Sequence, residues 1–262
     1  MSNKVLKPKK ASLYQFTQKY SNNIDNCIEF FKSMKWPEGF SCDRCGCHKY
    51  YLVKRVGKTK TSYVLECSSC HKQHSLLSGT IFQSCKLDLY KLLLGIFLFF
   101  NENKGISAVD LCSILDVNYK TALLLENKCR ILMSLSNSDK LLNSLFYEAD
   151  VFNIGAKSKN KAGRASEQQP ILGILSTDKE NNYPRFIKLR VITDYTGLSL
   201  KKNIEKCCVL SHDALLNTDG EKGFNTLNEE IQVKNEKISY EEKDHRLLWL
   251  NIIIGNIKNN IT

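Results

Sequence analysis

The sequence predicts a protein of several domains in the α+β or α/β class, with helices, a small metal-stabilised ribbon and a mixed sheet. Three observations support this class. Two close cysteine pairs fall between residues 42 and 70, apolar residues follow helical spacing through much of 81–137, and strand-like segments begin near residue 146. A chain of 262 residues with 42% hydrophobic residues can bury an ordinary core, so global disorder is not expected.

Four segments are expected along the chain. Residues 11–36 repeat apolar side chains at three- and four-residue steps, which predicts a helix that Trp36-Pro37-Glu38-Gly39 ends. Strands are expected at 50–55, 62–66, 146–153, 171–177, 186–193 and 214–218. Helices are expected within 87–133 and at 196–206 and 246–260. The predicted domains are an N-terminal helical arm (1–39), a ribbon (40–80), a helical region (81–137) and a sheet with flanking helices (138–262).

The cysteine pairs are the most specific local motif. Two intervening residues in each pair place both thiols on one tight turn, and the 21 residues between the pairs suffice for a β-ribbon that returns to the same ion. This spacing predicts a structural zinc ion held by Cys42, Cys45, Cys67 and Cys70. Four nearby side chains are either substitute ligands or bystanders: Cys47, His48, His71 and His74.

Basic charge is concentrated in the first half of the chain. Residues 1–133 contain 20 Lys and Arg against 10 Asp and Glu, whereas residues 134–262 contain 18 against 17. This asymmetry predicts contact with a polyanion, although a solvated lysine-rich surface gives the same count. No signal peptide opens the chain, and its most apolar run, 87–100, is too short to span a bilayer. We therefore expect a cytoplasmic, nucleoid-associated protein with no membrane partner.

A helix-turn-helix pattern lies within the helical region. Residues 106–115 form a short amphipathic segment, 116–118 form a turn, and 119–133 form a second helix with polar residues at its start. Any two packed helices give a similar pattern, but a neighbouring ribbon and a basic half favour DNA. The predicted DNA-contacting residues of this motif are Asn118, Tyr119, Lys120, Thr121, Lys128 and Arg130.

Seven motifs in a fixed order resemble a known family. They are Cys42-x-x-Cys45-Gly46, Cys67-x-x-Cys70-x-Lys72-Gln73-x-Ser75, Ser78-Gly79-Thr80-Ile81-Phe82, Lys104-Gly105-Ile106-Ser107-Ala108, Glu148-x-Asp150-x-x-x-Ile154-Gly155, Thr218-Asp219-Gly220 and Trp249-x-Asn251-x-x-x-x-Asn256-x-Lys258. Together they resemble bacterial insertion-sequence transposases with an N-terminal zinc ribbon, of the ISXO-type group. The resemblance implies that 138–262 is an RNase H-like domain of the DDE superfamily. It also implies a metal-binding triad whose third position is often Asn, followed two residues later by Lys.

The resemblance assigns the catalytic roles to Asp150, Asp219, Asn256 and Lys258, and the residue chemistry agrees with it. Asp150 lies within an apolar strand, Asp219 ends another strand, and their oxygens suit Mg²⁺. Asn256 offers a neutral third ligand on the last helix. Lys258 is not on the same helical face as Asn256, but its long stem is able to reach a phosphate. Asp219 before Gly220 also suits an ordinary turn.

The implied activity is a DNA transposase that binds double-stranded DNA at element ends, cleaves it and joins it to target DNA with two Mg²⁺ ions. A homodimer or larger assembly on DNA is expected from the same resemblance. A basic loop would contact phosphates or would simply be a solvated hairpin loop. Its residues are Lys157, Lys159, Lys161 and Arg164.

Three positions depart from the family pattern. Val151 stands where the family commonly has Glu, Leu248 replaces a Pro, and Asn251 replaces a His. The chain also stops at Thr262, where relatives usually continue, so a C-terminally incomplete catalytic domain is expected. Two alternatives therefore stay open beside the active enzyme. One is a catalytically inactive DNA-binding remnant, and the other is a zinc-ribbon and helix-turn-helix transcription regulator.

Overall fold

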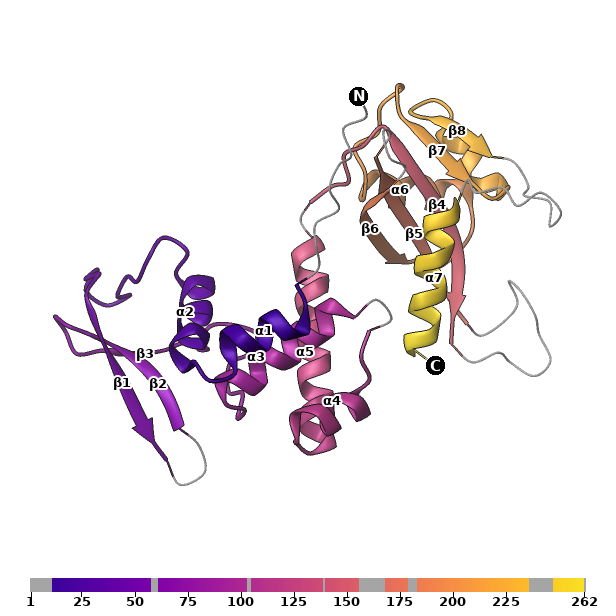
Figure 1. The fold of residues 1–262 in the computed structure, drawn as a ribbon. Coiled ribbons are helices and arrows are strands. Elements are labelled where there is room, and N and C mark those ends of the chain that lie inside the picture. Colours follow the sequence, from indigo (N-terminus) through magenta and orange to yellow (C-terminus); the bar gives the residue numbers. More distant parts are fainter. Residues whose placement is uncertain are drawn as a thin grey trace, which may run out of the picture. The chain divides into compact units, whose positions relative to one another are not determined.

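The computed structural model describes residues 11–57, 61–102, 105–138, 140–155, 168–178, 183–235 and 247–261. The chain forms two compact units, Met1–Ser134 and Leu135–Thr262 (Figure 1). Each unit contains one sheet together with helices, so the predicted mixed α/β class is confirmed. Within the described residues, no helix combines the length and apolar character needed to cross a membrane.

The first unit begins with two helices, α1 (Leu13–Tyr20) and α2 (Ile24–Lys35). The expectation of one continuous helix over 11–36 is therefore wrong. The reason is local: the Asn23 side chain accepts a hydrogen bond from the Asn26 backbone N–H at 3.2 Å, which starts a new helix. Both helices direct apolar residues inward, among them Phe16, Ile28 and Phe31.

A three-stranded antiparallel sheet follows, in the order β1 (Tyr50–Val56), β2 (Thr61–Cys67), β3 (Gln73–Ser75). β1 and β2 match the expected ribbon strands, and β3 is an additional strand. Cys67 ends β2 opposite Tyr50, while His74 of β3 lies opposite Leu65. The sheet thus brings the ends of β1, β2 and β3 next to the cysteine-bearing turns.

Three helices follow the ribbon: α3 (Leu89–Asn101), α4 (Ala108–Leu115) and α5 (Tyr119–Ser138), of which α5 continues four residues past the end of the first unit. Asp116 caps the C-terminus of α4 in the left-handed conformation with φ 49°, and α5 begins three residues later. Gly95 lets α3 and α5 approach closely, since a Cβ there would lie 2.5 Å from Leu125 Cδ2. One hydrophobic core joins α1, α2, the ribbon and the three helices, with Leu65, Leu92 and Leu111 fully buried.

The second unit has a five-stranded mixed sheet in the order β6-β5-β4-β7-β8. β4 (Phe146–Ile154), β5 (Gln169–Thr177) and β6 (Pro184–Val191) pair antiparallel, whereas β7 (Leu215–Thr218) and β8 (Gln232–Asn235) run parallel to β4. β8 was not expected from the sequence. Among the described residues, the other elements of this unit are α6 (Gly197–Glu205), a 3₁₀ helix η2 (Lys222–Leu227) and α7 (Leu248–Ile261).

Helices cover both faces of this sheet (Figure 1). On one face, Tyr147 and Ala149 of β4 join a core that includes Leu200 of α6. On the other face, Phe152 packs with Leu250 and Ile254 of α7. Because side chains alternate along a strand, Glu148, Asp150 and Phe152 all lie on the α7 face.

Candidate zinc and acidic sites

Two similar turns carry the four cysteines. The N–H of Gly46 donates to the Cys42 carbonyl at 2.8 Å, and the N–H of His71 donates to the Cys67 carbonyl at 3.1 Å. Gly46 and His71 both have positive φ, 71° and 55°, which reverses the chain directly after the second cysteine of each pair. The repeated Cys-x-x-Cys spacing therefore produces the same local turn twice.

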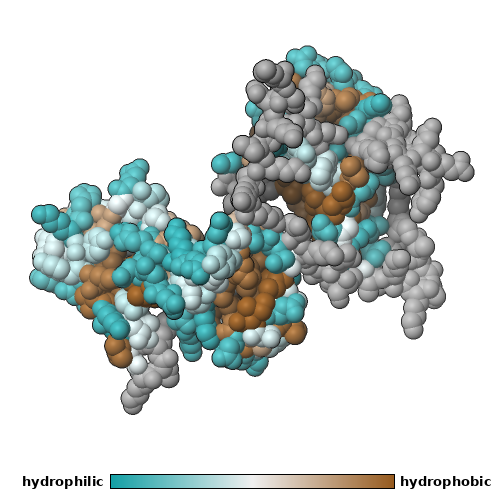
Figure 2. Space-filling view, viewed as in Figure 1, coloured by the Kyte–Doolittle hydropathy of each residue, from teal (hydrophilic) through white to brown (hydrophobic). Residues whose placement is uncertain are grey.

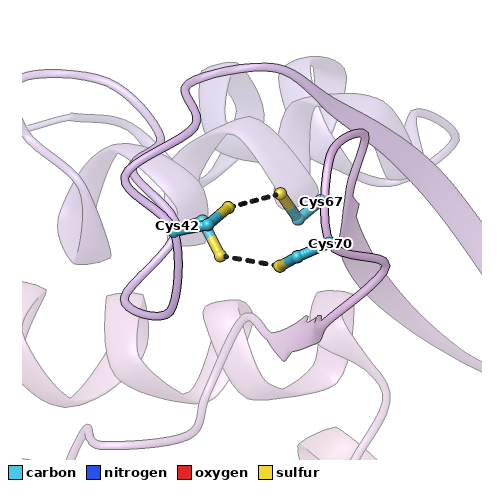
Figure 3. A group of neighbouring side chains, drawn as sticks. Cys42, Cys67 and Cys70 are labelled. Atoms are coloured by element: carbon cyan, nitrogen blue, oxygen red, sulfur yellow. Dashed lines mark hydrogen bonds between the residues drawn. The ribbon is translucent and has the colours of Figure 1, made fainter.

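The two turns bring the four sulfur atoms together (Figure 3). Cys42 Sγ lies 3.5 Å from Cys70 Sγ, Cys45 Sγ lies 3.5 Å from Cys67 Sγ, and all four lie within 4.8 Å of one another. A tetrahedral zinc ion with Zn–S bonds of about 2.3 Å places its sulfurs about 3.8 Å apart. The cluster therefore fits zinc.

At Cys42 the protein favours the thiolate form that a zinc ligand needs, whereas burial and the neighbouring cysteines raise the pKa values of Cys45 and Cys67. Burial opposes ionisation of the Cys42 thiol, but backbone N–H groups of Arg44 and Cys45 donate to its sulfur. With further hydrogen bonds from His74 and Cys70, they lower the pKa of Cys42 from 9.0 to about 6. Cys42 is thus prepared to bind a cation at neutral pH.

Three of the substitute ligands make other contacts. Cys47 Sγ lies 3.5 Å from Ser68 Oγ, His48 Nδ1 lies 3.0 Å from the Phe40 carbonyl, and His71 Nδ1 lies 3.3 Å from a carboxylate oxygen of Glu66. The buried His74 differs, because it lies within a second group with Cys42 and Asp43. The geometry favours the four cysteines as the zinc ligands, with His74 beside them.

An acidic pair is formed by Asp150, in the middle of β4, and Asp219, directly after the carboxyl end of β7. The parallel pairing runs from Phe146 opposite Leu215 to Glu148 opposite Asn217. Continuing this register by two residues, to one residue past the end of β7, places Asp150 level with Asp219 and on the same face. Burial and the neighbouring charge of Asp219 together raise the pKa of Asp150 from 3.8 to about 7. The sheet therefore brings together two carboxylates that repel one another.

Lys258 of α7 reaches this pair. Leu250, Ile254 and Lys258 follow one another at four-residue steps, so they form one stripe on the sheet-facing side of the helix. The Lys258 ammonium lies 5.7 Å from the centre of the Phe152 ring, and its charge opposes the rise in the pKa of Asp150. Asn256 is half-buried on the same helix, about 200° around the axis from Lys258. Its role as a metal ligand stays a prediction.

Glu148 is a buried residue to which the sequence reasoning gave no role. It is only 3% exposed, and its Oε2 accepts a hydrogen bond from the Leu250 backbone N–H at 2.9 Å. Burial raises the pKa of Glu148 from 4.5 to about 7. An acidic residue in an apolar strand, two positions before Asp150 and hence on its face, was the available signal.

The helix-turn-helix residues fall into two groups. Tyr119 and Lys120 are exposed in the first turn of α5. The other four contact groups within the unit. The Asn118 amide oxygen accepts hydrogen bonds from the backbone N–H and hydroxyl of Thr121, both at 2.9 Å, so Asn118 caps α5. Lys128 donates to a backbone carbonyl and Arg130 pairs with a buried glutamate.

DNA contacts by these six residues stay predictions. The predicted phosphate-binding loop cannot be compared, because Lys157, Lys159, Lys161 and Arg164 lie outside the described residues.

Comparison with known proteins identifies the first site. Residues 23–73 match the family described as the transposase zinc-ribbon domain, of the IS1595 type. The match begins at the residue that caps α2, ends at the start of β3 and includes all four cysteines. The N-terminal unit therefore carries a transposase-type zinc ribbon, which together with the cysteine cluster supports a structural zinc ion and a DNA-binding role. No curated protein matches the chain.

Proposed function

We propose that the chain is an insertion-sequence transposase of the ISXO-type group, whose second unit cleaves and joins DNA with bound Mg²⁺. The observation that carries the proposal is the proximity of Asp150 in β4 to Asp219, which directly follows the neighbouring parallel strand β7, in a chain that also has a transposase zinc ribbon. A mixed sheet with helices on both faces supports the RNase H-like fold that the resemblance implies.

The residues present fit a divalent cation. Two carboxylates kept close in a partly buried place repel each other, and a bound cation would remove that repulsion. In this proposal Asp150 and Asp219 hold Mg²⁺, and the Asn256 ligand that the resemblance implies would have to reach them from about 200° around α7 from Lys258. Bound Mg²⁺ would activate the attacking oxygen and neutralise charge on the phosphate. Lys258 would hold the phosphate from the helix side, since its ammonium already lies on the Asp150 face.

The proposal predicts Mg²⁺-dependent cleavage of duplexes carrying the DNA that flanks this reading frame. Asp219→Asn should lower the cleavage rate about 100-fold or more and leave DNA binding unchanged, because it removes a metal ligand at an exposed strand end. Asp213→Asn is the matched control, because Asp213 is an exposed aspartate that precedes β7. Cleavage by Asp219→Asn at the parent rate would refute the acidic site. A parent protein that binds these duplexes without cutting them would favour the noncatalytic DNA-binding alternatives.

DNA binding by α5 gives a second prediction. Lys120→Ala should weaken binding several-fold and reduce the slope of log affinity against log salt by about one, as expected for one lost phosphate contact. Lys19→Ala is the control, since it removes the same charge from an exposed site on α1 of the same unit. If Lys120→Ala and Lys19→Ala weaken DNA binding equally in salt titrations, the affinity depends on net charge alone and not on a contact made by α5. Asn118 is unsuitable for this test because its loss also removes the cap of α5.

A homodimer on DNA remains part of the proposal, because joining two element ends needs two sets of catalytic residues. Apolar surface gathers over the helical part of the first unit (Figure 2). On α5, Leu124 and Ile131 are 55% and 50% exposed and are seven residues apart, hence on one side of the helix. Such a stripe supports a protein contact there.

A further inference from the structure

The start of α7 is held by a side chain from a distant part of the sequence. Leu250 is the third residue of α7, and its backbone N–H is one of the first-turn donors that have no partner within a helix. The Glu148 carboxylate of β4, 102 positions earlier, accepts this hydrogen bond at 2.9 Å. A carboxylate at a helix N-terminus both caps the donor and interacts favourably with the helix dipole.

The spacing along the two elements links this cap to the acidic pair. From Glu148 to Phe152 the strand advances by about 13 Å. From Leu250 to Lys258 the helix advances by about 12 Å. Glu148 contacts Leu250 at one end, and the Lys258 ammonium lies over the Phe152 ring at the other. When α7 is fixed at Leu250, Lys258 therefore lies at the level of Asp150 and Phe152 along β4.

We propose that Glu148 is a positioning residue that sets the axial placement of α7 on β4 and thereby holds Lys258 beside Asp150. The inference rests on the proposed function for its catalytic meaning, but the docking of α7 is a property of the fold alone. A slip of α7 by one residue would shift Lys258 by about 1.5 Å and rotate it by about 100°, away from the sheet. Gly173, opposite Asp150 on β5, leaves room for this close docking, since a Cβ there would lie 3.3 Å from Leu250 Cδ1.

The alternative is that Glu148 is only a tolerated polar residue in the core. Two conservative changes separate the possibilities. Glu148→Gln keeps the reach and an acceptor oxygen but removes the charge, whereas Glu148→Asp keeps the charge but is one methylene too short to reach Leu250. If the hydrogen bond positions α7, the helix should dock almost normally in Glu148→Gln and more loosely in Glu148→Asp.

Hydrogen exchange and fluorescence on the full chain measure the docking without DNA or metal. In Glu148→Asp, we expect the amides of α7 to exchange about five- to tenfold faster, the loss expected for one helix cap, while those of β5 are unchanged. The chain has two tryptophans, so in a Trp36→Phe background Trp249 in the first turn of α7 is the single reporter, and its quenching by acrylamide should rise. Ile174→Val, on the opposite face of the sheet, is the control for general loosening.

Unchanged exchange of α7 in Glu148→Asp overturns the proposal, as does an equal rise across the whole second unit. A cleavage assay tests the link to Lys258. If Glu148 acts through Lys258, the double variant Glu148→Asp/Lys258→Met should cleave no more slowly than Lys258→Met alone, with DNA affinity retained. Additive losses would contradict that link. Absence of cleavage in the parent would reject the proposed function, whereas the exchange and fluorescence results would still decide whether Glu148 positions α7.

Discussion

Removal of zinc is expected to unfold the β1–β3 ribbon and to abolish DNA binding by the first unit. Zinc held by four cysteines contributes about 10–16 kcal/mol in small zinc domains, which is as large as the whole stability of an ordinary domain. The ribbon depends on this contribution because Cys42 and Cys67 are themselves part of the hydrophobic core of the unit. Without the ion, the four sulfur atoms would lose the bonds that hold the two turns together, and any thiolates among them would repel one another.

Chelation and a ligand substitution should give the same result. Cys67→Ser is expected to lose bound zinc and the hydrogen-exchange protection of β2, because Cys67 is fully buried at the end of that strand. Cys47→Ser is the matched control, since Cys47 is a neighbouring cysteine outside the four-sulfur cluster. Metal analysis should find one zinc per chain in the parent and in the control. One zinc per chain in Cys67→Ser, or none in Cys47→Ser, would contradict the assignment of the ligands.

The parts of the fold set by local sequence could be predicted. The Cys-x-x-Cys spacing determines a tight turn by itself, and two such turns are sufficient to define the zinc site before any tertiary structure is known. The strands β4 and β5 and the helix α7 are long and strongly apolar, so their existence follows from pattern. The break between α1 and α2 was missed because a single capping side chain, Asn23, decides it.

The parts set by tertiary packing could not be predicted. β3 has three residues and β8 has four, which is too short for a periodic signal. The acidic pair came from a family resemblance, and the parallel register of β4 with β7 now gives it a physical basis. The hydrogen bond from Leu250 to Glu148 and the contact of Lys258 with Phe152 exist only because α7 docks on β4, about a hundred positions away in sequence. No local pattern contains that contact.

Replacement of Asp150 by Asn is expected to stabilise the second unit at pH 8 in the absence of divalent cations while it abolishes cleavage. The pKa of Asp150 is raised from 3.8 to about 7, chiefly by burial and then by Asp219. Well below pH 3.8 the group is protonated in both the folded and unfolded states. As the pH rises from about 4 to about 7, the unfolded state ionises first, so stability is lost, and above pH 7 the loss is complete.

The size and specificity of this effect make it a sharp test. A shift from 3.8 to about 7 corresponds to a loss of at most about 4 kcal/mol at pH 8, so Asp150→Asn should raise the melting temperature by several degrees. Asp219→Asn, at an exposed position, should give a smaller rise because it removes the repulsion but not the burial of a charge. Some decline in stability with pH should persist in Asp150→Asn, since the pKa of Glu148 is also raised by burial.

Addition of Mg²⁺ should stabilise the parent and not the variant. A melting temperature that falls in Asp150→Asn at pH 8 would mean that ionised Asp150 does not destabilise the folded second unit. A cation would then have no carboxylate repulsion to remove at β4 and β7.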